Sequence, residues 1–98
     1  MKTCTRIEIV VEQSVSGQVI ELLHKLGAPG YTLIPDIRGA GDRGNRRGDE
    51  LAGDSSNCMF IIACDDEAII ESLRVGLRPL LSRSGGVCLV SAAEWLRH

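Results

Sequence analysis

The sequence predicts a single α+β domain, residues 1–98, with two helices on one face of a four-stranded antiparallel sheet. Three observations predict this class. Apolar and polar residues alternate in the first segment, two later segments repeat apolar residues at helical spacing, and turn residues separate the elements in the order βαββαβ. A chain of 98 residues suits one such domain and is too short for two.

The first strand and the first helix follow directly from the residue pattern. Residues 5–12 alternate between apolar and polar side chains, as in a strand with one buried face. Ser14 or Ser16 is the expected N-cap of the helix that follows. Its apolar stripe consists of Val15, Val19, Leu22, Leu23 and Leu26. Gly27 suits the left-handed position that ends such a helix, and Pro29 prevents its continuation.

The middle of the chain adds two strands and the second helix. Residues 30–37 predict a strand in which Pro35 indicates an edge position or a bulge, and residues 57–64 predict a strand that is apolar on both faces. We expect Asp65 to cap the second helix and Pro79 to kink its last turn or end it early. The apolar stripe of that helix consists of Ile69, Ile70, Leu73, Leu77, Leu80 and Leu81.

A glycine turn and a last strand complete the predicted fold. Residues 84–86 form the turn, residues 87–93 form the strand, and residues 94–98 are expected to be a short tail. The resulting order is that of the ferredoxin-like fold. The last two strands carry apolar residues on both faces: Met59, Ile61, Ala63, Cys88, Val90 and Ala92. Because a monomer would expose part of that surface, we expect an oligomer.

The composition changes abruptly in residues 38–54. This segment holds five glycines, four arginines and four acidic residues, and it is longer than most loops without a function. We expect a mobile loop that binds an anion: glycines let the backbone approach a ligand, and arginines donate paired hydrogen bonds to phosphate or carboxylate. The candidate residues are Gly39, Gly41, Arg43, Arg46 and Arg47. The alternative is a solvated loop in which the acids pair with the arginines.

Several functional classes are disfavoured by the same sequence. The net charge of -2 argues against a nucleic-acid-binding protein, and no apolar run approaches the roughly 20 residues that a membrane span needs. With no secretory pattern at the start of the chain, we expect a cytoplasmic protein whose four cysteines are free. His24 and His98 are the only histidines and have no partners by spacing, so we expect neither an enzyme nor a metal site.

Five short motifs stand in order along almost the whole chain. They are GAPGYT (27–32), GAGDR (39–43), the acidic pair at 65–66, SGGV (84–87) and AEWLR (93–97). Together they resemble the PII signalling family, and more closely its PII-like branch associated with inorganic-carbon uptake and carboxysomes. The resemblance implies a homotrimer with one nucleotide site in each cleft between subunits.

The resemblance also assigns roles to segments and residues. Residues of about 38–56 would be the T-loop, which folds over the phosphates and docks on a transporter or a carbon-metabolism protein. Residues of about 83–87 would be the B-loop, and 94–98 the C-terminal tail. The residues implied to bind the nucleotide are Gly30, Tyr31, Thr32 and Ile62 at the adenosine, and Gly39, Gly41, Arg43, Arg46, Gly85, Gly86, Val87 and Arg97 at the phosphates.

The departures from the family pattern affect the expected ligand. Classical PII proteins carry a B-loop lysine that holds the outer phosphates of ATP, and Gly86 stands in that position here. Gly44 replaces the T-loop glutamine that helps to bind magnesium and 2-oxoglutarate. The resemblance therefore implies ADP or AMP rather than ATP, without a required metal. The resemblance also implies bicarbonate as a second ligand, at Gly41, Arg43, Arg46 and Arg47.

The sequence thus predicts a regulatory protein without enzymatic activity. Nucleotide and bicarbonate would change the conformation of the T-loop, and so regulate a partner in inorganic-carbon uptake or carboxysome metabolism. Two alternatives stay open: a CutA-like trimer that binds divalent cations, and an ACT-like domain that binds a small molecule.

Overall fold

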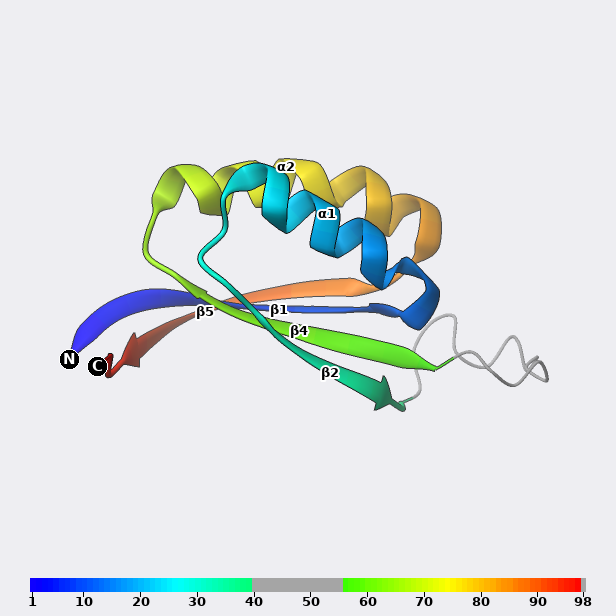
Figure 1. Cartoon of the computed structure of the whole chain (residues 1–98), viewed down its shortest axis with the longest axis horizontal. Helices are drawn as coiled ribbons and strands as arrows, with labels where there is room; N and C mark the ends of the chain where they lie inside the picture. The colour runs from blue at the N-terminus through cyan, green and yellow to red at the C-terminus, as the bar shows by residue number, and fades with distance from the viewer. Residues whose placement is uncertain (40–55, 98) are drawn as a thin grey trace.

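The computed structural model describes residues 1–39 and 56–97. In chain order these residues form β1 (Lys2–Glu12), the 3₁₀ turn η1 (Gln13–Val15), α1 (Ser16–Leu26), β2 (Thr32–Ile37), β4 (Asn57–Cys64), α2 (Glu67–Ser84) and β5 (Val87–Trp95). The strands make one antiparallel sheet in the order β2-β4-β1-β5, and both helices cover the same face of it (Figure 1). The predicted ferredoxin-like fold is confirmed. None of the helices in these residues is long and apolar enough to cross a membrane.

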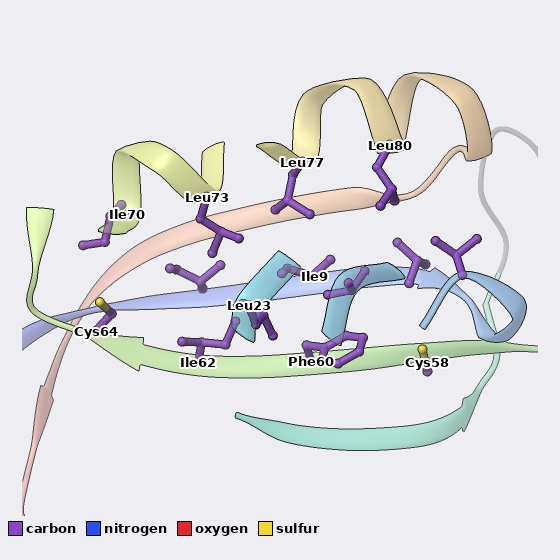
Figure 2. Close-up of a cluster of buried hydrophobic side chains, with 14 residues drawn as sticks. Ile9, Leu23, Cys58, Phe60, Ile62, Cys64, Ile70, Leu73, Leu77 and Leu80 are labelled. Carbon is purple, nitrogen blue, oxygen red and sulfur yellow. The ribbon is translucent and has the colours of Figure 1, made fainter. Parts of the chain in front are cut away.

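The hydrophobic core lies between the sheet and the two helices (Figure 2). Alternate residues of β1 and β4 point toward the helices, as the pleat of a strand requires. Phe60 is the largest fully buried side chain, and it lies opposite Ile9 in the register of the two strands. The helices contribute Val19, Leu23, Ile70, Leu73, Leu77 and Leu80. Burial of each large apolar side chain stabilises the fold by roughly 1.5–3 kcal/mol.

The two ends of α1 differ in how well the sequence predicted them. Gly27 adopts φ 72° and its amide donates to the carbonyl oxygen of His24, so the predicted left-handed end is confirmed. The predicted cap at Ser14 or Ser16 is wrong. The 3₁₀ turn η1 leads straight into the helix, and Val15 occupies the cap position without a side-chain hydrogen bond.

The start and the end of α2 correct two further predictions. Asp66, not Asp65, is the N-cap: its carboxylate accepts hydrogen bonds from the amides of Ala68 and Ile69, at 2.9 and 3.3 Å. Of the two outcomes predicted for Pro79, the early end is wrong, because the helix continues to Ser84, and the kink stays a prediction. A proline leaves the carbonyl four residues earlier without its helical partner, and here that residue is Val75, which is 62% exposed.

The strand ends also shift from the predicted positions. The ladder between β1 and β5 extends to the pair Lys2–Trp95, so residues 94–95 belong to a strand and not to a tail. The interpretation of Pro35 is confirmed, because β2 is an edge strand with a register shift between Ile34 and Ile37. Asp36 takes the left-handed conformation in that bulge, with φ 57°.

The sheet face away from the helices is open, as Figure 1 shows. The register places Leu89, Glu8 and Ile61 side by side across three strands on this face. Arg6 and Glu8 form an ion pair on it, with Nε and Oε2 2.7 Å apart. The edge strand β5 is exposed on both faces, since Val90 on the helix side is 53% exposed and Leu89 on the open side 56%. The predicted exposure of apolar surface in a single chain is therefore confirmed.

Candidate functional site

The described candidate residues lie in different regions of one chain. The sheet register defines two ends: Val87 lies beside Val10 near the end of β1, whereas Trp95 lies beside Lys2 at its start. Eight residue steps along β5 separate these two positions, which corresponds to about 26 Å at roughly 3.3 Å per residue. We call them the Val10 end and the Lys2 end of the sheet.

The glycine turn and the start of the 38–56 segment lie at the Val10 end. Gly85 and Gly86 lead into Val87, which pairs with Val10. Gly39 lies two residues beyond β2, whose last residue Ile37 pairs with Asn57. A hydrogen bond of 2.9 Å from the amide of Gln13 to the carbonyl of Ser56 joins the ends of β1 and β4 here. The predicted phosphate-binding backbone therefore gathers at one end of the sheet.

The conformation of the glycine turn explains its sequence. The amide of Gly85 donates to the carbonyl of Leu81 at 2.8 Å and closes α2. Gly86 has φ 117°, a conformation that side chains rarely adopt. A Cβ at Gly86 would also lie 2.6 Å from the carbonyl oxygen of Val10. Any other residue would have to displace the backbone, so glycine is required here by packing alone.

The residues predicted to border the adenosine lie elsewhere. Gly30, with φ 129°, and Tyr31 precede β2, and Thr32 is its first residue, opposite Ile61. Tyr31 is 40% exposed and packs edge-on against Phe60, with ring centroids 5.4 Å apart. Ile62 is 1% exposed and points toward the helices. Only its backbone could border a ligand, because its side chain belongs to the core.

Arg97 lies beyond the Lys2 end. Its guanidinium carbon lies 4.5 Å from the centroid of the Trp95 ring, a cation–π contact. Nearby in the register, Lys2 forms an ion pair of 3.4 Å with Asp65. Arg97 and Gly86 are thus separated by the length of β5. One small ligand cannot touch both residues of the same chain.

The other arginine and glycine candidates fall in the segment between β2 and β4. The predicted phosphate and bicarbonate residues Gly41, Arg43, Arg46 and Arg47 lie outside the described residues. Residues 1–39 and 56–97 contain no group of three or more His, Cys, Asp or Glu side chains arranged to hold a metal ion.

The cysteines in the described ranges are free and packed into the fold. Cys4, Cys58 and Cys64 are buried and Cys88 is half-buried. Burial raises the pKa of the Cys58 thiol above its ordinary value of 9.0. Burial also raises the pKa of Cys88, with a smaller opposing effect of Arg74. Both thiols are therefore protonated at neutral pH and are poor nucleophiles.

One groove in the described structure lies on the helix side of the sheet. It lies between α1 and α2, has a volume of about 410 Å³, and contains Leu22 and Lys25 on one wall and Glu71, Ser72 and Val75 on the other. No predicted binding residue lines it. Gly76 also lines the groove, and its lack of a side chain is explained by the packing of the two helices. A Cβ at Gly76 would lie 2.8 Å from Leu22 Cδ1.

Comparison with models of protein families shows the family to which this chain belongs. The model of the family described as nitrogen regulatory protein P-II matches residues 4–98. The chain belongs to the PII family. No curated protein sequence matches it.

Solved structures agree with this assignment. CPII from Thiomonas intermedia, in a complex with ADP and bicarbonate, shares 26% identity at a TM-score of 0.81, over 97% of this chain and 90% of that one. The CPII complex with ADP, AMP and acetate shares 25% identity at a TM-score of 0.81, over 98% and 91% of the two chains. A PII-like signalling protein from Thermus thermophilus has the same fold at 20% identity and a TM-score of 0.72, over 97% and 90%.

Sequence reasoning left two neighbours of the candidate residues unassigned. Val10 was expected only in a strand, although its carbonyl lies against Gly86; a contact between residues so far apart in sequence has no local signal. The sequence assigns no role to Trp95, because it predicts a tail over residues 94–98. Extending the last strand by two residues places Trp95 in the ladder, beside Arg97.

Proposed function

We propose that this PII-family protein is a non-enzymatic regulator that binds an adenine nucleotide between two copies of the chain, as a homotrimer. The observation that carries the proposal is the division of the candidate residues between the two ends of the sheet. Gly85 and Gly86 lie at the Val10 end, and Arg97 lies beyond the Lys2 end, about 26 Å away along β5. Both groups can contact one nucleotide only if they come from neighbouring subunits.

The open sheet face supports an assembly of identical chains. Leu89 and Val87 expose apolar surface on this face at the edge strand β5. The Arg6–Glu8 pair lies on the same face and is neutral within each chain, so burial against another copy would not leave an unpaired charge. We infer that this face forms the trimer interface and that the helices face outward.

Packing at the glycine turn supports ADP or AMP in preference to ATP. Gly86 cannot carry a side chain without moving, because Val10 occupies the space. The only lysines of the chain, Lys2 and Lys25, lie far from this turn, at the start of β1 and near the end of α1. Backbone amides after Gly85 can meet an anion in a glycine turn, but no lysine of the same chain lies at this turn to hold outer phosphates.

Bicarbonate as a second ligand rests on the similarity to CPII, which binds ADP and bicarbonate. We propose that both ligands bind together and change the conformation of the 38–56 segment, the T-loop, which would then regulate a transporter or a carbon-metabolism protein. By linkage, each ligand should raise the affinity for the other by the same factor. Neither a CutA-like cation site nor an ACT-like site is favoured by any arrangement in the described residues.

Isothermal calorimetry tests the ligands. ADP and AMP should bind to the wild-type protein more tightly than ATP does in the absence of magnesium, and bicarbonate should tighten ADP binding. Equal ADP affinity with and without bicarbonate would refute the coupling between the two ligands. Failure of ADP, AMP and ATP to bind would refute the proposed function.

Mixed trimers test whether the site lies between subunits. Arg43→Ala and Arg97→Ala each remove one proposed phosphate contact. If the two arginines come from different chains, random mixing of the variants at equal amounts rebuilds about a quarter of the sites, because each interface combines two independently chosen chains. A site within one chain would recover none. Light scattering must show that both variants and the mixture remain trimeric.

A matched pair of surface variants tests the interface. Leu89→Glu places a second carboxylate opposite Glu8 on the open face, and should give monomers that no longer bind ADP. Val75→Glu is the control: Val75 is similarly exposed, at 62%, but lies on the helix side. It should remain trimeric and bind ADP as the wild type does. A trimeric Leu89→Glu protein would place the interface elsewhere.

A further inference from the structure

We propose that Trp95 is a positioning residue whose ring holds the guanidinium of Arg97 in place to bind an anionic ligand. This inference rests on the proposed nucleotide function and adds a residue to its site. The guanidinium carbon lies 4.5 Å from the ring centroid, well within the roughly 6 Å over which a cation is attracted to an aromatic face.

The charges at the Lys2 end explain why this arrangement favours an external anion. Lys2 is already paired with Asp65 at 3.4 Å. Arg97 contacts the Trp95 ring, which carries no charge. Within the described residues, the positive charge of Arg97 is therefore not compensated by a carboxylate. An arginine stacked on a ring keeps its edge donors available for a phosphate, because the ring occupies only the flat face of the guanidinium.

The position of the ring is set by the strand and not by a hydrogen bond. Trp95 is the last residue of β5, pairs with Lys2 in the sheet register, and is half-buried. Its indole Nε1 is shielded from solvent and has no hydrogen-bond partner in the described structure. The ring is thus held by the hydrogen-bonded pairing of β1 and β5, and the exposed side chain of Arg97 packs on it. Without the ring, Arg97 would have to lose more side-chain freedom on binding.

Trp95 is the only tryptophan in the chain, so its fluorescence reports on this site directly. The experiment titrates ADP into the full-length trimer and follows heat and tryptophan emission for the wild type, Arg97→Lys and Arg97→Ala, and heat alone for Trp95→Ala and Trp95→Phe. Leu96→Ala is the matched control, because Leu96 lies between the two residues and is 84% exposed.

Trp95→Ala should weaken ADP binding about two- to five-fold, the range that corresponds to an exposed cation–π contact, and Trp95→Phe should recover part of the loss. Arg97→Lys should weaken binding because an ammonium group does not stack as a guanidinium does. ADP should change the emission of Trp95 in the wild type, and that change should be lost in Arg97→Ala. Leu96→Ala should bind as the wild type does.

The outcomes separate this inference from the function on which it rests. If the wild type binds ADP and Trp95→Ala binds it equally well, Trp95 does not position Arg97, and the nucleotide function stands. If Trp95→Ala and Trp95→Phe are both folded trimers and bind equally weakly, the aromatic face is not the cause and the inference is overturned. If the wild type does not bind ADP, the proposed function fails, and the role of Trp95 in it fails as well.

Discussion

Replacement of Gly86 by alanine should strongly destabilise the fold, although it adds a single carbon atom. The residue has φ 117°, and holding a side chain in such a conformation costs roughly 1–3 kcal/mol. The added Cβ would also lie 2.6 Å from the Val10 carbonyl oxygen and 3.1 Å from Val11 Cγ1. Overpacking of this kind costs typically about 1–3 kcal/mol. We therefore expect the free energy of unfolding to fall by about 2–6 kcal/mol.

Two further glycines separate the strain from the clash. Gly30 has φ 129° but open space where a Cβ would lie, so Gly30→Ala should show the conformational cost alone, about 1–3 kcal/mol. Gly17 in α1 has open space and ordinary helical backbone, and Gly17→Ala should stabilise the protein by about 0.4–1 kcal/mol. The difference between the Gly86 and Gly30 variants then measures the contact with Val10.

Urea unfolding followed by circular dichroism measures all three variants. The protomer concentration must be held constant, because the stability of an oligomer depends on it. If Gly86→Ala unfolds with the same free energy as the wild type, or with the same loss as Gly30→Ala, the turn is not held against Val10. The steric explanation for the missing lysine would then be wrong.

Three other predictions concern the fold itself. Asp66→Ala should lower the free energy of unfolding by about 0.5–2 kcal/mol, because the α2 cap is lost. Asp65→Ala removes only an exposed ion pair and should lower it by at most about 1 kcal/mol. Urea unfolding compares the two variants. Phe60→Ala should cost about 3–5 kcal/mol in the same assay, and a loss below about 1 kcal/mol would contradict its place in the core. Burial raises the pKa values of Cys58 and Cys88, so their contribution to stability is fully present below pH 9.0 and is lost as pH rises through the folded-state pKa values. Above pH 9.0, the free energy of unfolding of a Cys58→Ala variant should therefore decline less than that of the wild type. Parallel curves of unfolding free energy against pH would contradict the raised pKa.

Periodicity and turn chemistry predicted the elements of this fold because both are local. Gly27 ends α1 as predicted, because the left-handed conformation at the end of a helix is a local requirement that does not depend on distant residues. The errors came where tertiary structure decides. The end of β5 depends on how far β1 extends to pair with it, and Lys2–Trp95 is a pairing that no short window of sequence contains.

The cap of α2 shows a subtler limit. Asp65 and Asp66 are both good N-caps by residue type, and the choice between them depends on where β4 ends. Asp66 takes extended backbone, φ -103° and ψ 109°, and turns its carboxylate onto the first amides of the helix. Asp65 then lies toward Lys2. Two adjacent acids thus have different roles, which only the register of the sheet assigns.

The candidate site could be predicted as a set of residues but not as an arrangement. Motifs placed Gly86 and Arg97 in the same set, and nothing in the sequence says that β5 keeps them about 26 Å apart. That separation is itself informative. If Gly86 and Arg97 bind the same ligand, they can do so only across a boundary between copies. Each copy would then contribute the glycine turn to one ligand and Arg97 to another, so every interface of a closed ring would hold one complete site. Ligand binding and assembly would in that case be coupled through β5, whose exposed Leu89 lies between the two ends.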